Sequence, residues 1–315
     1  MHLLSLLLAS LFTVVELNCE NLFDCQHDSL KNDTEFLPDG KYRWTPKRYW
    51  LKLNRVGQTI LACGGDSAAW QVPDLVALCE VENDTVLRDL TQRSLLRKAR
   101  YEYVMTDSPD ERGIDVALLY SPFSFRLLSS RSVRVQTVEG MRPTRDILYV
   151  SGLIQGGDTL HVCVAHFPSR RGGEAHTRPY RKQAARALRS ITDSILALSP
   201  RAKILLAGDF NDEGHSPSLD FIAEGGFTDV SIGATGCHGA SATYRYKGRW
   251  GSLDHIFASP PLASRLQECI VMDAPFLLTD DRKYGGKQPR RNFLGPRYKK
   301  GYSDHLPLVA RFLWP

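Results

Sequence analysis

Short apolar runs separated by polar turns cover most of the chain, and this pattern predicts more strands than helices. Apolar runs of about four to eight residues, bounded by Gly, Asn, Asp or Ser, are typical of buried strands. The predicted strands span residues 12–17, 74–79, 101–105, 115–120, 125–135, 146–154, 159–165, 203–207, 252–258 and 307–313. They come in clusters and do not alternate strictly with helices.

Helices are predicted where apolar residues recur at helical spacing, in residues 45–61, 84–97, 178–198 and 219–224. Thr45 and Pro46 supply a cap and a first turn for the first of them. Clustered strands with few intervening helices favour two packed mixed β-sheets flanked by helices, an α/β fold of the α+β kind. No linker or internal repeat divides the chain, so we expect a single domain over residues 12–315.

Residues 1–11 allow two interpretations. The segment MHLLSLLLAS resembles the apolar part of a secretory signal, with a small residue at Ala9, but it is short and lacks a cationic start. It is either a possible leader or a truncated start that continues into a buried strand, and localisation stays open between cytoplasmic and exported. No other stretch approaches the roughly 18 apolar residues that span a bilayer, so we expect no stable membrane span.

Residues 279–301 form the least structured stretch of the pattern, and they are long for a loop. No acidic residue occurs between Arg282 and Lys300, where Lys and Arg are concentrated. Aromatic residues that could stack on bases or pin the loop to the body interleave with these charges: Tyr284, Phe293, Tyr298 and Tyr302. The stretch therefore either closes over an anionic substrate or is an ordinary solvated loop.

Composition and charge narrow the function classes only slightly. With 43% hydrophobic and 24% charged residues the chain is an ordinary globular protein. A net charge of +5 suits an anionic substrate such as a phosphate ester without requiring a polymer. The seven cysteines contain no CxxC pair, which disfavours a zinc cluster. No GxSxG elbow or P-loop motif occurs, which argues against a serine hydrolase or nucleotide-driven work.

The candidate chemistry lies in polar residues that follow the buried strands. Sheets deliver such residues into one crevice, where the scaffold fixes their positions. Taken singly, each residue has a structural alternative, as a solvated or hydrogen-bonded group. The clusters are Asn18 with Asn21, Glu80, His166, Asp209 with Asn211, Asp254, and Ser303 with Asp304 and His305.

Two of these clusters carry further detail. Asp209 and Asn211 follow Gly208 and are two residues apart, so in an extended segment both would face one target; an Asx-type turn is the alternative. Asp254 could orient a histidine and hold its tautomer. His255 beside it would point the other way in a strand, and we expect it to be structural.

Together the clusters form an ordered set that resembles the endonuclease/exonuclease/phosphatase superfamily. The similar blocks are VVELNCENLF, LVALCEVEN, RGIDVALLY, VAHFPSR, LLAGDFND, GSLDHIFAS and GYSDHLPL. They occur in the family's order between Phe12 and Phe312, and GDFND and SDHLPL with the distant Glu80 form the specific part. The resemblance implies a four-layer sandwich of the deoxyribonuclease I type.

The resemblance also implies a Mg²⁺ or Mn²⁺ cofactor and in-line attack of water at phosphorus. Glu80 looks like the principal metal ligand, Asn18 lies where the family places a metal-site amide, and Asp304 where a further carboxylate supports the metal. This suits Mg²⁺, which takes few protein ligands and keeps several waters. His166 would contact a phosphoryl oxygen. Asp115 resembles the family acid that pairs with that histidine.

For proton transfer, the resemblance implies that His305 acts as general base on the attacking water, with Asp254 orienting and polarising it. Asp209 is the rival for this role, and the sequence leaves the two open. Asp209 and Asn211 would otherwise position the nucleophile and the phosphate.

Arginines near these motifs are candidates for substrate binding, because the guanidinium group binds phosphate bidentately. Arg170 and Arg171 follow His166 directly, and Arg290 and Arg291 lie in the late basic stretch that leads into Asp304. A solvated loop is the alternative in both places.

The sequence thus predicts a divalent-metal-dependent hydrolase of phosphate esters, a phosphodiesterase, with an endonuclease as the subdivision to test. The alternatives are a phosphomonoesterase acting on a small or lipid-linked phosphate, and a catalytically dead binding scaffold. The expected partner is the phosphate-ester substrate, with nucleic acid as one candidate, and we expect a monomer. Because fold does not fix substrate, the substrate itself stays open.

Overall fold

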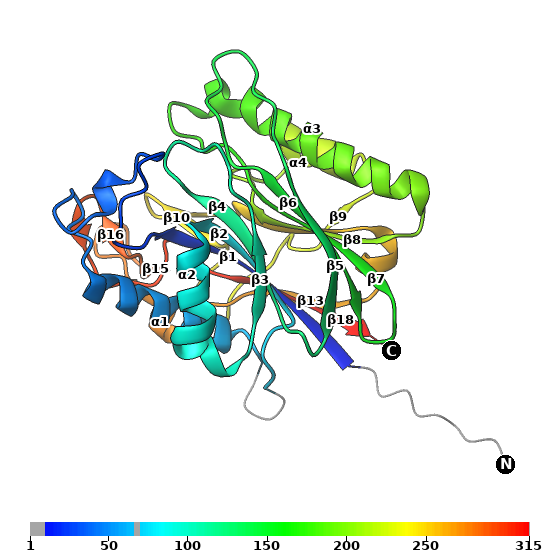
Figure 1. Cartoon of the computed structure of the whole chain (residues 1–315), viewed down its shortest axis with the longest axis horizontal. Helices are drawn as coiled ribbons and strands as arrows, with labels where there is room; N and C mark the ends of the chain where they lie inside the picture. Colours follow the sequence, from blue (N-terminus) through cyan, green and yellow to red (C-terminus); the bar gives the residue numbers. More distant parts are fainter. Residues whose placement is uncertain (1–9, 66–69, 315) are drawn as a thin grey trace.

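The computed structural model describes residues 10–65 and 70–314 of the 315-residue chain (Figure 1). The possible leader, residues 1–11, therefore lies outside the described residues except for Ser10 and Leu11, which open the first strand. None of the described helices is long and apolar enough to cross a membrane.

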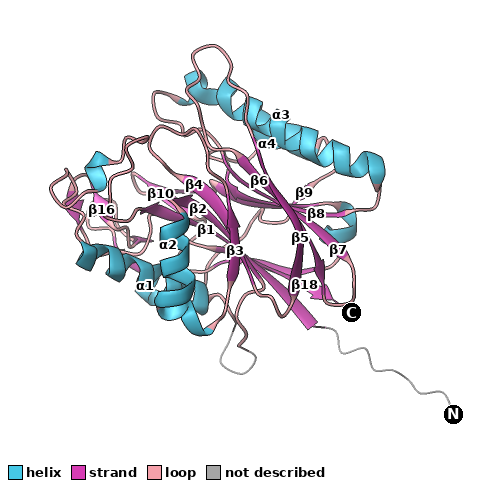
Figure 2. Ribbon diagram, viewed as in Figure 1, coloured by secondary structure: helices cyan, strands magenta, loops and turns pink. Residues whose placement is uncertain are grey.

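Two six-stranded mixed sheets form the centre of the fold (Figure 2). The first has the order β13-β18-β1-β2-β4-β3. Its strands are β1 (Ser10–Leu22), β2 (Leu75–Val81), β3 (Glu102–Met105), β4 (Asp115–Tyr120), β13 (Leu266–Val271) and β18 (Leu308–Trp314). The second has the order β5-β6-β7-β8-β12-β9. Its strands are β5 (Phe125–Val133), β6 (Ile147–Ile154), β7 (Thr159–His166), β8 (Lys203–Asp209), β9 (Thr228–Asp229) and β12 (Asp254–Ala258).

Alternating side chains of the central strands feed separate cores, because successive residues of a strand point to opposite faces. Val14 and Ala77 pack between the two sheets, whereas their neighbours Val15 and Val76 pack under the helices of the first sheet. A third core joins the second sheet to the long helix near Leu188. Buried strands with apolar residues on both faces thus give four layers, helix, sheet, sheet and helix, as the sequence predicts.

The helices cover the outer faces of the two sheets (Figure 1). The longest are α1 (Pro46–Ala62), which begins after Thr45 as predicted, and α3 (Glu174–Leu198), which begins four residues before the predicted start at 178. The predicted helix over 84–97 is instead a series of short turns. These are α2 (Asp84–Arg88), a π-helical turn (Asp89–Arg93) and a 3₁₀ turn (Leu95–Lys98). The remaining helical segments are Thr34–Phe36, α4 (Pro217–Ala223), α5 (Pro260–Ala263) and Pro275–Leu277.

Several strands extend further than the sequence predicts, among them β1 and β8. β1 continues through Asn18 to Leu22, and β8 continues through Gly208 to Asp209. Gly208 does not break its strand. A side chain there would collide with the carbonyl oxygen of Ala165, so glycine permits the close pairing of β7 and β8. The polar residues that the sequence places after these strands, such as Asn18 and Asp209, therefore lie within the last residues of the strands themselves.

The stretch over 279–301 is not an unstructured loop. It contains two short hairpins, β14 (Leu278–Asp280) with β15 (Lys287–Pro289), and β16 (Phe293–Leu294) with β17 (Arg297–Tyr298). Phe293 and Tyr298 pack against Trp44, with ring centroids 5.8 and 6.4 Å from the indole. These two aromatic residues pin the stretch to the body of the protein.

A further hairpin, β10 (Tyr244–Tyr246) with β11 (Arg249–Gly251), is absent from the sequence prediction. Its two-residue turn has left-handed backbone at Lys247 and Gly248 (φ 48° and 81°). Such a turn usually carries Asn-Gly or Asp-Gly, so Lys-Gly gives a weak signal.

Candidate functional site

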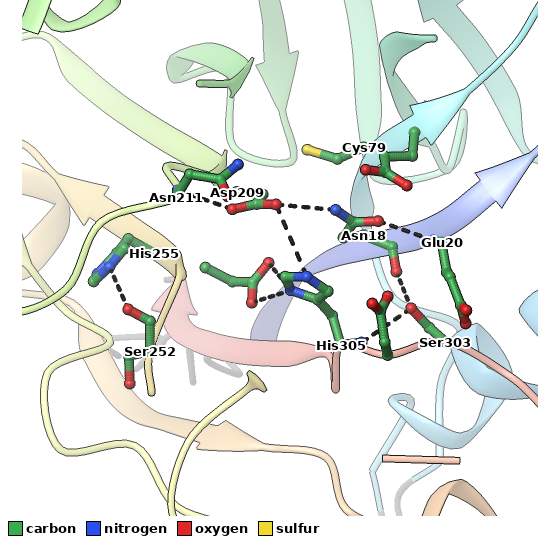
Figure 3. A network of polar contacts seen from close by, with 12 residues as sticks. Asn18, Glu20, Cys79, Asp209, Asn211, Ser252, His255, Ser303 and His305 are labelled. Atoms are coloured by element: carbon green, nitrogen blue, oxygen red, sulfur yellow. Dashed lines mark hydrogen bonds and ion pairs between the residues drawn. The ribbon is translucent and has the colours of Figure 1, made fainter. Parts of the chain in front are cut away.

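One cavity collects the polar residues that the sequence places at strand ends. Its volume is about 790 Å³, and it opens between the ends of the central strands of the two sheets. The predicted site residues that line its floor are Glu80, His166, Asp209, Asn211, Asp304 and His305. These residues come from four separate stretches of sequence that meet in one place. Asp209, Asn211 and His305 are labelled in Figure 3.

His305 is held in orientation by Asp254. The ring atom Nδ1 lies 3.0 and 2.8 Å from the two carboxylate oxygens of Asp254, and both side chains are buried. Burial alone would lower the pKa of His305, but the charges of Asp254, Asp209 and Asp304 outweigh it and raise that pKa well above 6.5. The pair leaves Nε2 on the side of Asp209, 4.0 Å from its Oδ2 atom.

Asp209 lies at the centre of the floor. Its Oδ2 atom accepts a hydrogen bond from Nδ2 of Asn18 (3.0 Å) and is 3.5 Å from Nε2 of His166. Burial raises the pKa of Asp209 to about 7. The positive charge of His305 opposes this rise, and the negative charge of Asp254 adds a smaller contribution to it. A carboxyl group with such a pKa can exchange a proton near neutral pH.

Asn211 combines the two alternatives that the sequence leaves open. Its backbone N–H donates to Oδ1 of Asp209 (2.9 Å), which is an Asx-type turn, and its own backbone is left-handed (φ 51°). Its side chain nevertheless lines the cavity beside Asp209, with Nδ2 donating to the carbonyl oxygen of Phe167 (3.1 Å). The turn therefore aims both side chains at the same space.

Glu80 enters the cavity from the end of β2. Its backbone is left-handed (φ 61°), as are those of Glu20 and Asn21 on the neighbouring strand (φ 50° and 57°). The N–H group of Asn21 donates to Oε2 of Glu80 (2.8 Å), and Oε1 lies 4.0 Å from Nε2 of His166. Sparsely populated backbone conformations concentrated at one site are typical of functional positions.

His166 stands between Glu80 and Asp209 in a fully buried position. Burial lowers its pKa well below 6.5, and the charges of Arg145 and Arg112 lower it further. The ring is therefore neutral at pH 7. Arg145 donates to the carbonyl oxygen of Phe167 (2.7 Å), and no motif in the sequence marks it.

The predicted pairing of Asp115 with His166 is wrong. The carboxylate of Asp115 accepts hydrogen bonds from the backbone N–H of Ser108 (3.0 Å) and from the hydroxyl groups of Ser108 and Thr106. Asp115 does not line the cavity. Its carboxylate fixes the turn before β4. Its partners are the hydroxyl groups of Ser108 and Thr106, which the family resemblance does not indicate.

Asn18 and Asp304, both predicted near the metal, differ in their access to the cavity. Asn18 is not part of the wall, because its Nδ2 binds Asp209 and its Oδ1 accepts the N–H of Glu20 (2.9 Å). Asp304 does line the cavity, with Oδ2 bound to Nη2 of Arg291 (2.6 Å). Burial alone would raise the pKa of Asp304, but the charges of His305 and Arg291 lower it.

The residues on the floor fit a hard divalent cation. Glu80 and Asp304 each use one carboxylate oxygen in the hydrogen bonds just described, which leaves a second oxygen to each. Two carboxylates beside open space are the donor set that Mg²⁺ prefers, since it keeps several waters. Asp209, Asp254 and His305 also lie within ligand distance of one another, but Nδ1 of His305 is occupied by Asp254.

The rim of the cavity carries both arginine and aromatic side chains. Arg170 and Arg171 line it as the sequence predicts, and Arg170 pairs with Glu213 (2.6 Å). Arg290 and Arg291 are not among the lining residues, because Arg290 lies over the ring of Tyr302 and Arg291 pairs with Asp304. The sequence analysis missed the other charged and aromatic lining residues, which are Arg112, Glu174, Glu213, Tyr244, Tyr246, Arg249 and Trp250.

His255 is structural, as its place in the strand predicts. Its Nδ1 atom lies 2.7 Å from Oδ2 of Asp229, and its Nε2 atom contacts the carbonyl oxygens of Asp212 and Ser252 at 3.0 and 3.1 Å. It faces away from His305 across β12 (Figure 3).

Comparisons with known proteins agree with this architecture. Residues 13–312 match the model of the Endonuclease/Exonuclease/phosphatase family. A protein of that family from Bacteroides thetaiotaomicron is 15% identical, with a TM-score of 0.64 over 98% of this chain and 96% of that one. A mannosyl-6-phosphatase from the same organism is 15% identical, with a TM-score of 0.60 over 95% and 98%. Truncated Caenorhabditis elegans TDP2 is 17% identical, with a TM-score of 0.56 over 96% and 97%. No curated protein matches.

Proposed function

The chain belongs to the endonuclease/exonuclease/phosphatase family, and from this membership together with the cavity we propose that it hydrolyses a phosphate ester by attack of water at phosphorus. The observation that carries the proposal is the unbroken series of contacts across the floor. Glu80 lies 4.0 Å from His166, His166 lies 3.5 Å from Asp209, and Asp209 lies 4.0 Å from His305. Four groups therefore face one space. Glu80 is a carboxylate that can bind a cation, His166 is a neutral histidine, and Asp209 and His305 form a titrating pair.

Glu80 and Asp304 would hold the divalent cation, Mg²⁺ or Mn²⁺. When bound there, the ion supplies positive charge that offsets the negative charge building on the phosphoryl and leaving oxygens. Arg291, paired with Asp304, orients that carboxylate from behind. Asn18 acts through Asp209 and Glu20 rather than as a direct ligand, because both of its polar atoms are already bound.

Of the two candidate bases, the geometry and the pKa directions favour Asp209. Its pKa of about 7 lets it accept the proton of the attacking water near neutral pH. His305, whose pKa is raised well above 6.5, is protonated at the same pH and donates from Nε2 toward a phosphoryl oxygen. The neutral His166 and the amide of Asn211 position the phosphate between them.

The finer proposal is a phosphodiesterase, with nucleic acid as the first polymer to test. The cavity is open at its rim and far larger than one phosphate group, so it accepts an ester with substituents on both sides. Arg170 and Arg171 at the rim suit an anionic substrate.

The test is hydrolysis of bis-p-nitrophenyl phosphate and plasmid DNA with Mg²⁺, Mn²⁺ or EDTA, and of p-nitrophenyl phosphate as the monoester. We expect turnover of the diester with either cation and its loss in EDTA. Full activity in EDTA would contradict the cation. Preference for the monoester would keep the family chemistry but replace the phosphodiesterase with a phosphomonoesterase.

A further inference from the structure

A second group of potential metal ligands lies outside the cavity, on the loop between β9 and β10. Cys237 and His238 are adjacent on this loop, and Asp273 follows the end of β13. None of the three lines the cavity. Their donor atoms, Sγ, Nδ1 and Oδ1, all lie within 4.8 Å of one another.

The three donor atoms form a triangle of the size that a tetrahedral cation requires. Sγ lies 3.1 Å from Nδ1, Nδ1 lies 3.2 Å from Oδ1, and Sγ lies 3.7 Å from Oδ1. The usual bond lengths of zinc to sulfur, nitrogen and oxygen give edges of about 3.4–3.6 Å for one face of a tetrahedron. The side chains therefore need shifts of only a few tenths of an ångström to bind one ion.

Asp273 is already fixed as such a ligand requires. Its carboxylate is 1% exposed and accepts backbone N–H groups from Cys237 (2.9 Å), His238 (2.7 Å) and Ala240 (3.0 Å). Any side chain at Gly236 would collide with it, since a Cβ atom there would be 2.1 Å from Cγ of Asp273. Carboxylates that bind metals are commonly held by hydrogen bonds of this kind.

The other two ligands are open to solvent. The side chain of His238 is 45% exposed, and Cys237 is the one exposed cysteine of the seven. Four of the others are fully enclosed, where a thiol acts as a small apolar side chain. An ion bound here would have three protein ligands and a solvent-facing fourth position.

A role in anchoring the loop explains why the carboxylate of Asp273 is buried. It does not explain why the thiol of Cys237 and the imidazole of His238 both contact Oδ1 of that carboxylate. We propose that Cys237, His238 and Asp273 form a surface site for a thiophilic divalent cation of the Zn²⁺ type. Sulfur and imidazole ligands select Zn²⁺ over Mg²⁺ or Ca²⁺, which bind oxygen. A thiolate and a carboxylate also balance the two positive charges of the ion.

Such an ion would tie the β9–β10 loop to the segment after β13. A backbone hydrogen bond already joins the loop to the last residue of β13, from the N–H of Val271 to the carbonyl oxygen of Thr235 (3.2 Å). The loop leads into β10, where the ring of Tyr244 lies 4.8 Å from that of His305. The site therefore stabilises the fold next to the cavity without contacting the substrate.

The experiment is a Co²⁺ titration of the full chain, reduced and metal-free, with Mg²⁺ in excess to fill the cavity. Thiolate bound to Co²⁺ gives an intense near-ultraviolet charge-transfer band that carboxylate sites lack. In the wild type we expect this band to saturate at one equivalent of Co²⁺ and to disappear when Zn²⁺ displaces the Co²⁺. In Cys237→Ser we expect no such band. His238→Asn should weaken Co²⁺ binding at least tenfold.

Cys269→Ser is the matched control, because Cys269 is a half-buried cysteine on β13 that belongs to no such cluster. It should leave the band unchanged. The proposal is overturned if the wild type shows no charge-transfer band, or if the band survives in Cys237→Ser. Since the readout is spectroscopic, it does not depend on turnover. A Zn²⁺-dependent rise in Tm that Cys237→Ser removes would support the site further.

Discussion

The floor and the rim of the cavity differ in how firmly their side chains are held. On the floor, Asp209 has three polar neighbours and His305 has two contacts to Asp254, and all are buried on strand ends of the two sheets. At the rim, Arg171 and Arg249 are exposed. No carboxylate of the described residues lies within 4.0 Å of either guanidinium. The scaffold thus fixes the reaction chemistry, whereas loops and one hairpin present the groups that meet the rest of the substrate.

This contrast predicts that substitutions on the floor change kcat and that substitutions at the rim change KM. Groups on the floor act on the reacting atoms, so their loss raises the barrier of the chemical step. Groups at the rim bind substrate and transition state about equally, which affects binding alone.

The largest effect is expected for Asp209→Asn. The substitution keeps the size and the hydrogen bond to Asn211 but removes the group that accepts the proton of water. We expect kcat to fall by roughly 10²–10⁴, measured on bis-p-nitrophenyl phosphate with saturating Mg²⁺. Asp115→Asn is the matched control, a buried acid outside the cavity, which should lower thermal stability and leave kcat within about threefold. Equal losses in both variants would place Asp115 back in the machinery.

The sequence predicts those features of this arrangement that depend on neighbouring residues better than those that depend on residues far apart in the chain. Strands buried on both faces carry their signal in a few consecutive apolar residues, so β2, β7 and β8 are predicted to within two residues of their ends. The floor residues follow from those strand ends. The motif order then identifies the family over nearly the whole chain.

Features held by distant partners are not predictable in this way. The late stretch over 279–301 appears unanchored in sequence because its anchors are elsewhere. Glu20 accepts the N–H of Phe293 (2.9 Å), and Lys52 and Arg55 of α1 donate to carbonyl oxygens of residues 300–302. The pairs are separated by 245 to 273 residues. Asp115 failed for a different reason. Its partners Ser108 and Thr106 are near in sequence, but a family resemblance does not reveal which local hydroxyl groups bind a carboxylate.

The Cys237–His238–Asp273 cluster also depends on residues that are far apart in the sequence. A search for paired CxxC motifs disfavours zinc, because its ligands usually recur at short spacing. Here the third ligand lies 35 residues after His238 and is brought to the loop only by the end of β13. Adjacent Cys and His residues alone carry no such signal.

The next largest effect concerns the pH profile and sharpens the division of roles on the floor. Because Asp209 acts as the carboxylate, kcat/KM should rise as pH increases through about 7. Because His305 acts in its protonated form, kcat/KM should fall again once pH passes its raised pKa. Asp254→Asn removes the charge that raises this pKa, so the alkaline limb should move down by about 1–3 pH units.

The acidic limb provides the internal comparison for Asp254→Asn, since loss of the Asp254 charge by itself lowers the pKa of Asp209. If the alkaline limb stays in place, then the titration of His305 does not cause the fall in kcat/KM at high pH. The general-base role would then return to the histidine. Profiles of kcat/KM with saturating Mg²⁺ between pH 5 and 10 decide between the two.

The smallest effect is expected at the rim, for Arg171→Gln. An exposed charge pairs with phosphate in water and contributes at most about 1 kcal/mol, so KM should rise about two- to fivefold with kcat unchanged. The increase should shrink when salt is raised from 0.05 to 0.5 M, because screening weakens exposed charges most.

Arg290→Gln tests whether the rim ends where the cavity does. Its guanidinium is 5.8 Å from the ring centroid of Tyr302 and lies outside the cavity lining, so KM should change by less than about twofold. If Arg290→Gln raises KM as much as Arg171→Gln, then the late stretch grips the substrate after all. The pinned hairpins β14–β17 would in that case be part of the binding surface, and the boundary between a fixed floor and a permissive rim would have to be drawn further out.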